Sequence, residues 1–278
     1  MVEKRGWGTY LMHAILITGI ALVCFPIYLT FVASSVTHDQ VIQPPLPLIP
    51  GNLLTDNYSR ALFEGTGTPV ITMLINSAVM ALGIAIGKIV ISIISAYAIV
   101  YFRFRFRMFF FWAIFMTLML PVEVRIVPTY EVVSSLGMLN SYTGLILPLI
   151  ASATATFLFR QFFMTVPEEL LEAARVDGAG PFRFFKDILL PLSRTNIAAL
   201  FVILFIYGWN QYLWPLLVTT EPDMNTIVMG LKLMMPQADD FGDWPVTMAT
   251  AMLAILPPVA VVLLMQRLFV KGLIDSEK

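Results

Sequence analysis

The amino-acid sequence predicts an all-α, polytopic membrane protein with six transmembrane helices. Of its 278 residues, 58% are hydrophobic and only 13% are charged, which is about half the charge of an ordinary soluble domain. The mean hydropathy is +0.82. The apolar residues are also gathered into long runs, and a helix needs roughly 20 such residues to cross the hydrocarbon core of a bilayer.

Six runs are long enough to span a membrane. They cover residues 11–33, 70–101, 108–128, 139–163, 196–218 and 246–268. The second run is longer than a bilayer requires, so we expect it to tilt or to project from the membrane. The first run could be a signal peptide. However, it is longer than the apolar part of a typical signal peptide, and the chain crosses the membrane again afterwards, so we expect an uncleaved anchor.

The distribution of basic residues predicts the orientation, because cytoplasmic loops carry an excess of lysine and arginine. If the N-terminus is cytoplasmic, most of the 17 basic residues fall in inner segments, including those of the inner turn "YFRFRFRMFFF". The outer segments then hold only Arg60, Arg125 and Lys232. We therefore expect both termini to lie in the cytoplasm.

Two outer segments are long, residues 34–69 and 219–245. The first is rich in proline ("QPPLPLIPGN"), and the second carries Glu221, Asp223, Asp239, Asp240 and Asp243. Loops of this length are usually functional or act as linkers. Each is either a solvated surface or a docking surface for an external partner.

The most charged segment of the chain is "EELLEAARVDGAGPFRFFKDILLP", residues 168–191, between the fourth and fifth runs. Thr165 and Pro167 suit the start of a helix, Gly178 suits its end, and Pro181 suits the start of a second short helix. Two interpretations follow from the residues alone. The segment is an amphipathic loop lying on the bilayer, or it is a rigid hairpin that fits a cleft on a cytoplasmic partner.

The same segment contains the loop signature of ABC-importer permeases: Glu-Ala-Ala, three residues, Gly, nine residues, then Ile-x-Leu-Pro. Here those positions are Glu172, Ala173, Ala174, Gly178, Ile188, Leu190 and Pro191. "SAYAIVYFRF" and "YGWNQYLWPL" are similar to the sugar-importer branch of this family. "FFWAIFMTLMLPVEVRIVPTYEVV", "ASATATFLFRQFF" and "GLIDSEK" resemble permeases of bacterial sn-glycerol-3-phosphate importers. The resemblance covers nearly the whole chain.

This resemblance implies the type I ABC importer permease fold, with residues 1–278 as one transmembrane domain and a cytoplasmic coupling hairpin at about 165–192. It implies a multi-pass protein of the bacterial inner membrane, surrounded by membrane lipid. Its partners would be a second, homologous permease forming a heterodimer, two cytoplasmic ABC ATPases that bind ATP and Mg²⁺, and a periplasmic substrate-binding protein. The residues expected to couple to the ATPase are Glu172, Ala173, Ala174, Asp177, Gly178, Ile188, Leu190 and Pro191.

The chain itself is not expected to be an enzyme or to hold a cofactor. A phosphate-binding loop needs GxxxxGK followed by Ser or Thr, whereas the only "GK", Gly87-Lys88, is followed by isoleucine within an apolar run. Hydrolysis must then come from a partner. His13, His38 and the single Cys24 are too scattered for a metal site. A net charge of −1 gives no basic field for nucleic acid.

Ionisable groups within a membrane are costly and are therefore candidates for function. Lys88 lies in the second run and has three possible roles: contact with a substrate phosphate, pairing with a carboxylate on another helix, or snorkelling to the interface. Glu123 and Arg125 lie near the outer end of the third run, and two residues apart they do not face each other on a helix. They line an outer mouth of the pathway or pair with the partner permease.

Asn210, Gln211 and Trp209 in the fifth run complete the pathway candidates. Amides in spans commonly bond between helices, and a tryptophan there is more typical of the core or of an interfacial belt than of ligand stacking. The chain offers few cations for a phosphate. Recognition could therefore rest mainly with the second permease or the binding protein.

Three other functions compete with an importer permease for sn-glycerol-3-phosphate. A permease of the same architecture for a sugar or oligosaccharide fits the polar and aromatic span residues equally well. An ion- or proton-driven carrier often shows inverted repeats and buried acidic relays, and neither is evident. A membrane enzyme needs catalytic groups clustered within reach of one another, and the sequence offers no such cluster.

Overall fold

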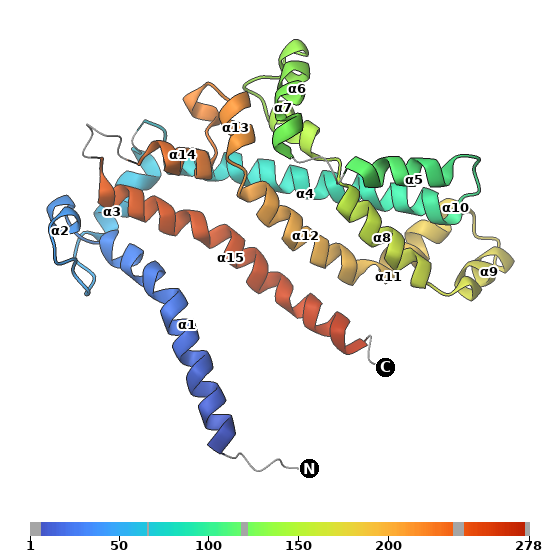
Figure 1. Cartoon of the computed structure of the whole chain (residues 1–278), viewed down its shortest axis with the longest axis horizontal. Coiled ribbons are helices and arrows are strands. Elements are labelled where there is room, and N and C mark those ends of the chain that lie inside the picture. The colour runs from blue at the N-terminus through green and yellow to red at the C-terminus, as the bar shows by residue number, and fades with distance from the viewer. Residues whose placement is uncertain (1–6, 66, 118–121, 236–241, 276–278) are drawn as a thin grey trace. The chain divides into compact units, whose positions relative to one another are not determined.

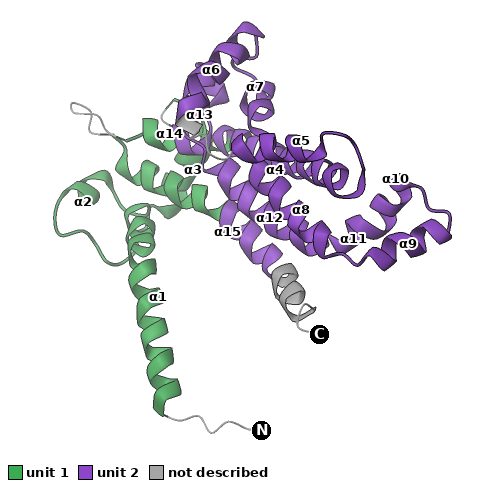
Figure 2. Ribbon diagram, turned by 45° about the vertical axis from the view of Figure 1, so that its right-hand side comes forward, with its two compact units in different colours: residues 1–71, 230–256 green, residues 72–229, 257–278 purple. Residues whose placement is uncertain are grey.

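The computed structural model describes residues 7–65, 67–117, 122–235 and 242–275 (Figure 1). Side chains are described for these residues except 122–123 and 267–275. The described part is helical and contains no β-strand, which confirms the predicted all-α class for these residues. It divides into two compact units, residues 1–71 with 230–256 and residues 72–229 with 257–278 (Figure 2).

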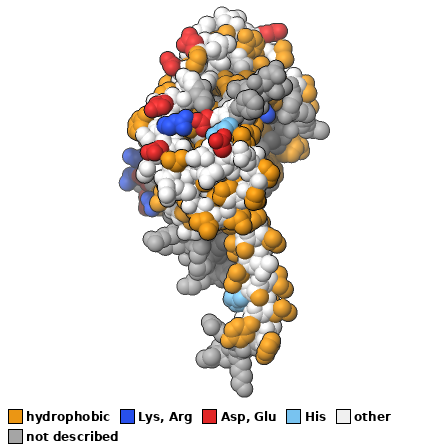
Figure 3. Space-filling view, turned by 90° about the vertical axis from the view of Figure 1, so that its left-hand side faces the viewer, with side chains coloured by type: hydrophobic (Ala, Val, Ile, Leu, Met, Phe, Trp, Pro, Cys, Tyr) orange, Lys and Arg blue, Asp and Glu red, His pale blue; other side chains and the backbone are white. Residues whose placement is uncertain are grey.

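Unit 1 contains α1 (Trp7–Ala33), α2 (His38–Ile42), α3 (Leu54–Phe63) and the first part of α15 (Trp244–Asp275). Along α1, only Val32 and Ala33 near its end are buried. Figure 3 shows hydrophobic side chains along its visible surface. A helix that is apolar on all sides and not covered by protein suits a lipid environment.

The end of α1 is joined to α3 by polar contacts. The Asn57 amide donates to the carbonyls of Ser34 (3.0 Å) and Val36 (3.1 Å), and the Leu53 amide donates to the carbonyl of Ser35 (3.1 Å). These bonds provide partners for carbonyl groups that follow the helix end and have none within it. They also fix the direction in which the chain leaves α1.

Unit 2 is built around α4 (Val70–Tyr101). Its core is a cluster of buried side chains from four helices: Met80, Ile84, Val133, Leu145, Trp214 and Val218. The helices that follow α4 are α5 (Arg107–Met116), α6 (Val122–Ser135), α7 (Tyr142–Ile146), η2 (Leu147–Leu149), α8 (Ala153–Thr165), α12 (Arg194–Trp209), α13 (Leu213–Val218), η4 (Pro222–Met224) and α14 (Ile227–Leu233). The hairpin between α8 and α12 is described below.

Two glycines on one face of α4 allow the segment after α7 to approach closely. A Cβ atom at Gly83 would lie 2.6 Å from Cδ1 of Ile146, and one at Gly87 would lie 2.5 Å from Cγ2 of Ile150. Small residues four positions apart are a common means of close packing in membranes. Here they bring residues 146–150 against α4 beside Lys88.

Three helices are long and apolar enough to cross a membrane: α1, α4 and the part of α15 from Trp244 to Gln266. They correspond to the first, second and sixth predicted runs. Two bent helix pairs raise the number to as many as five among the described residues. They are Tyr142–Leu149 with Ala153–Thr165, bent by 48°, and Pro181–Leu192 with Arg194–Trp209, bent by 71°.

The fourth and fifth predicted runs are not continuous helices. In residues 139–163 the helix is interrupted after η2, and in residues 196–218 it ends at Trp209 and restarts at Leu213. Pro215 explains the second break, because in an unbroken helix it could donate no hydrogen bond to the carbonyl of Gln211. The third predicted run, 108–128, falls on α5 and the start of α6, and residues 118–121 between them lie outside the described part.

Candidate functional site

The hairpin between α8 and α12 begins with α9 (Glu168–Val176). This helix ends in a Schellman turn, in which the Ala179 amide donates to the Ala174 carbonyl (2.8 Å) and the Gly178 amide donates to the Arg175 carbonyl (3.1 Å). Gly178 has a φ of +70°, a conformation that glycine adopts without strain. The predicted helix end at Gly178 is therefore confirmed.

The predicted helix start is wrong in one detail. Thr165 is the last residue of α8 rather than the cap of α9, and its hydroxyl donates to the Phe162 carbonyl at 2.7 Å. Pro167 precedes α9 and provides no side-chain cap. The backbone conformation of this proline leads into the helix. The acidic side chains of Glu168 and Glu169 in the first turn stabilise the helix start, because negative charge is favourable at the positive end of the helix dipole.

The second arm of the hairpin is helical from Pro181 to Leu192 in three parts: α10 (Pro181–Phe184), a π-helical turn η3 (Phe185–Leu189) and α11 (Leu190–Leu192). Proline at the first position costs nothing, because the N–H it lacks would have no partner there. The wide π turn ends at Leu189, two residues before Pro191. It accommodates a proline within the helix, since Pro191 cannot donate to the carbonyl four residues earlier.

Aromatic side chains anchor the hairpin to the end of α4. The Tyr97 hydroxyl donates to the Pro181 carbonyl at 2.9 Å, and its ring lies 4.9 Å from that of Phe185. The Tyr101 ring lies 5.3 Å from that of Phe184, which is buried. Buried aromatic contacts of this kind carry large apolar areas and specific geometry. The second arm is therefore fixed to α4.

The other side of the hairpin carries exposed side chains. Val176 is 87% exposed and Phe182 is 76% exposed. Glu172 and Arg175 of α9 are also exposed, whereas Ala174 is buried. Of the other predicted coupling residues, Ile188 is half-buried and Ala173, Asp177, Gly178, Leu190 and Pro191 are exposed. Exposed large apolar side chains beside charges are typical of an interaction surface.

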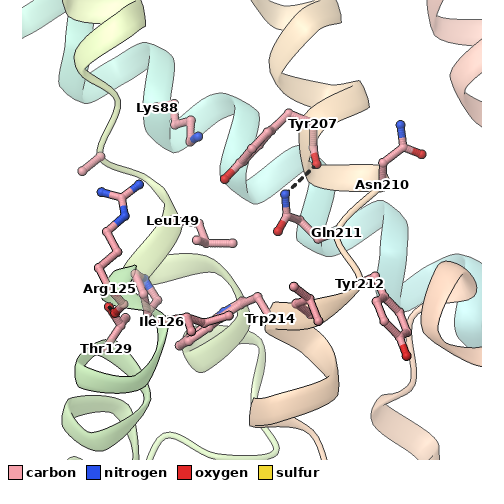
Figure 4. Close-up of a pocket in the computed structure, with 13 residues that line it drawn as sticks. Lys88, Arg125, Ile126, Thr129, Leu149, Tyr207, Asn210, Gln211, Tyr212 and Trp214 are labelled. Atoms are coloured by element: carbon pink, nitrogen blue, oxygen red, sulfur yellow. Dashed lines mark hydrogen bonds between the residues drawn. The ribbon is translucent and has the colours of Figure 1, made fainter. Parts of the chain in front are cut away.

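Unit 2 also contains a cavity of about 360 Å³ (Figure 4). Its wall combines Lys88 from α4, Arg125 and Thr129 from α6, the segment at residues 148–151, and the break between α12 and α13. The break places Asn210 and Gln211 on the wall. Irregular backbone at membrane depth is tolerated only where it is buried in protein or lines such a cavity.

Lys88 is the buried charge of this cavity, with only 7% of its surface exposed. Its Nζ lies 3.8 Å from the centre of the Tyr207 ring, a distance typical of a cation–π contact. The Gln211 amide donates to the Tyr207 carbonyl at 3.1 Å. Figure 4 shows Lys88 and Arg125 reaching the cavity from two different helices. The described lining residues include no carboxylate.

The remaining predicted candidates are Trp209 and Glu123. Trp209 is buried and stacks on Phe205 at 5.7 Å, and it is not among the described residues that line the cavity. The side chain of Glu123 lies outside the described part. The sequence reasoning missed Tyr207 and Thr129 as lining residues. Tyr207 lies three positions before Asn210, so the helix period places the two on neighbouring faces. Among the described residues, no cluster of acids, histidines or cysteine could hold a metal ion.

Residues 88–275 match the family described as the inner membrane component of binding-protein-dependent transport systems. The chain belongs to this family. The family predicted from the loop signature is thereby confirmed, and the chain is a transport component with several apolar helices that suit a membrane. The matched region includes both the hairpin and the cavity of this permease.

Curated relatives match the permease over its full length. The "sn-glycerol-3-phosphate transport system permease protein UgpE" of Brucella melitensis is 62% identical over 282 residues, covering 100% of both chains. The protein of the same name from Rhizobium meliloti is also 62% identical with the same coverage, and that of Yersinia pestis is 59% identical over 281 residues, again covering 100% of both.

A solved structure has the same fold. It is a chain of a bacterial ABC transporter involved in the import of the acidic polysaccharide alginate, with a TM-score of 0.80 and 20% sequence identity, covering 96% of this chain and 99% of that one. At this identity the similarity concerns the fold alone. It confirms that the permease has the fold of an ABC transporter permease.

Proposed function

We propose that this chain is a permease subunit of an ATP-driven, binding-protein-dependent importer that moves sn-glycerol-3-phosphate across a bacterial inner membrane. The observation that carries the proposal is the 62% identity, over the full length of both chains, to permeases named for this substrate. The coupling hairpin supports the ATP-driven part, because an ion-coupled carrier has no need of such an element.

The working assembly has four kinds of subunit. This chain crosses the membrane six times as one domain, residues 1–278, with both termini in the cytoplasm, and it forms half of the pathway. A second, homologous permease forms the other half. Two cytoplasmic ATPases bind ATP and Mg²⁺, and a periplasmic binding protein delivers the substrate.

The geometry of the hairpin suggests how ATP hydrolysis reaches the pathway. Glu172 and the neighbouring exposed side chains of the coupling loop contact the ATPase, and Tyr97 joins the opposite side of the hairpin to α4. Lys88 of the cavity lies nine residues before Tyr97, which is about 14 Å along a helix. A displacement of the hairpin therefore moves the cavity wall.

Transport by this displacement requires two further properties of the importer. The interface between the two permeases switches between inward-facing and outward-facing arrangements. The substrate binds these arrangements with different affinity, because a ligand shifts an equilibrium only by its differential affinity.

Uptake in a deletion strain tests the proposal. A strain lacking its own glycerol-3-phosphate uptake systems receives this chain with its cognate permease, ATPase and binding protein, and uptake of radiolabelled sn-glycerol-3-phosphate and maltose is measured. We expect saturable uptake of the phosphate ester only, lost when the ATPase carries an inactive ATP site. Uptake of the sugar alone, or uptake that survives loss of the ATPase, would overturn the proposal.

A further inference from the structure

We infer that the cavity around Lys88 and Arg125 is an anion subsite in this chain that binds the phosphate group of the transported molecule. This inference rests on the proposed function for the identity of the ligand. It goes beyond that function by placing phosphate recognition in this subunit, whereas the scarcity of cations in the sequence suggested that recognition rests mainly with the other subunits.

The first argument is that the described side chains provide no counter-charge for Lys88. The ion pairs among the described side chains are Arg60–Asp243 and Arg183–Asp187, and neither includes Lys88 or Arg125. The Lys88 ammonium lies over the face of the Tyr207 ring. A buried ammonium is costly unless it is paired. A ring face offsets only part of that cost, so a mobile anion is the partner that fits.

The second argument is the proximity of a second cation. Arg125 of α6 and Lys88 of α4 line the same cavity (Figure 4). Like charges in one pocket oppose each other until a ligand of opposite charge lies between them. Arginine and lysine are the side chains that bind phosphate most strongly, through charge-assisted hydrogen bonds.

The third argument is the chemistry of the rest of the wall. Asn210 and Gln211 bring amides, and Tyr212 and Thr129 bring hydroxyl groups. These groups suit the hydroxyls of a small polyol attached to the phosphate. A cavity of about 360 Å³ lies within the range of small-molecule sites, roughly 300–1,000 Å³.

The two alternative roles of Lys88 fit the structure less well. A lysine that snorkels keeps its head group in water, whereas Lys88 is 7% exposed. Pairing with a carboxylate finds no partner among the described residues that line the cavity. Glu123 precedes Arg125 by two residues, a spacing at which side chains of one helix do not face each other.

Transport kinetics provide the first test. The complete importer is reconstituted in proteoliposomes with Lys88→Met, Arg125→Gln, Glu123→Gln or the matched control Lys232→Met, which removes an exposed lysine outside the cavity. We expect Lys88→Met and Arg125→Gln each to raise the KM for sn-glycerol-3-phosphate by roughly 10- to 100-fold, as for one lost hydrogen bond to a charged group. Glu123→Gln and Lys232→Met should leave KM unchanged.

A thiol reporter provides a test that does not depend on transport. Cys24 is the only cysteine of the chain, so Cys24→Ser with Thr129→Cys places a single thiol in the cavity, and both cations remain. The rate of modification by a small methanethiosulfonate reagent is measured on the whole complex. We expect protection by sn-glycerol-3-phosphate and by inorganic phosphate, none by glycerol, and none by any of them once Lys88→Met is added.

The outcomes separate the subsite from the proposed function. Phosphate protection in a complex that does not import sn-glycerol-3-phosphate would support the subsite and overturn the function. Import with an unchanged KM in Lys88→Met and Arg125→Gln, and no protection of the Thr129→Cys thiol, would support the function and overturn the subsite. A shift in KM with Glu123→Gln equal to that with Lys88→Met would identify a structural ion pair and also overturn the subsite.

Discussion

The hydroxyl of Tyr97 donates a 2.9 Å hydrogen bond to the main-chain carbonyl of Pro181. The bond joins α4, which lines the cavity, to the first residue of the hairpin's second arm. The ring of Tyr97 also lies 4.9 Å from that of Phe185, so the contact has a polar and an apolar part. In the proposed mechanism this is the junction through which motion of the hairpin reaches the pathway.

Tyr97→Phe removes the hydroxyl and keeps the ring. A hydrogen bond of this kind contributes about 1 kcal/mol net, so we expect the complex to assemble normally while less substrate is imported for each ATP hydrolysed. Uptake and ATPase activity are measured together in proteoliposomes. Tyr101→Phe is the matched control, because the Tyr101 hydroxyl donates to the Phe163 carbonyl of α8 at 3.3 Å rather than to the hairpin. If Tyr97→Phe and Tyr101→Phe imported the same amount of substrate for each ATP hydrolysed, the Tyr97–Pro181 bond would not be the path by which hairpin motion reaches the cavity.

Gly178→Ala should weaken the hairpin turn. At a φ of +70° a residue with a Cβ atom costs about 1–2 kcal/mol, and no neighbour lies within 4 Å of the added atom, so the effect is one of backbone conformation. We expect reduced uptake with normal membrane insertion. Gly180→Ala is the control, because Gly180 has a φ of −71° and also has open space around it. If Gly180→Ala impaired uptake as much as Gly178→Ala, the turn would not be the cause.

Glu172→Ala should uncouple the ATPase from uptake. Glu172 is exposed and takes part in neither of the ion pairs found among the described residues, so the thermal stability of the purified permease should not change. Uptake should fall, and stimulation of ATP hydrolysis by the loaded binding protein should be lost. Glu168→Ala removes a charge one turn earlier on the same helix and should have little effect. A Glu172→Ala importer with wild-type uptake would contradict the proposed contact with the ATPase.

Gly87→Ala should disturb the packing beside the cavity. The added Cβ atom would lie 2.5 Å from Cγ2 of Ile150, and overpacking of this kind costs about 1–3 kcal/mol. We expect a lower melting temperature of the detergent-solubilised complex, restored by adding Ile150→Ala. Gly19→Ala in α1 has no atom within 4 Å of its new Cβ and should leave the melting temperature unchanged. Failure of Ile150→Ala to restore stability would show that the contact is not responsible.

The sequence predicted those parts of the fold that depend on local pattern. Long apolar runs predicted α1, α4 and α15, and the spacing of Glu172 and Gly178 predicted the family and the end of α9. It did not predict the break between α12 and α13, where Pro215 outweighs the continuous apolar character of the run. Nor could it place Thr165, since a threonine two residues before a proline is compatible with the end of one helix as well as the start of the next.

The cavity itself could not be predicted from the sequence. Lys88, Arg125, Asn210 and Gln211 were candidates because each is polar in an apolar run, but nothing in their spacing showed that they line one cavity. Their convergence depends on Gly83 and Gly87, which allow residues 146–150 to approach α4. This close approach is a tertiary effect of two glycines, and a single sequence gives little indication of which helices will pack closely.

The central claim is that the hairpin between α8 and α12 lies in the cytoplasm and contacts the ATPase subunit. Val176 at the end of α9 is 87% exposed, so Val176→Cys in a Cys24→Ser background gives this chain one reactive thiol, on the hairpin. A photoactivatable maleimide attached to this thiol in the intact importer should cross-link the permease to the ATPase subunit. Cross-linking to the periplasmic binding protein, or labelling of the thiol in whole cells by a membrane-impermeant reagent, would contradict the account.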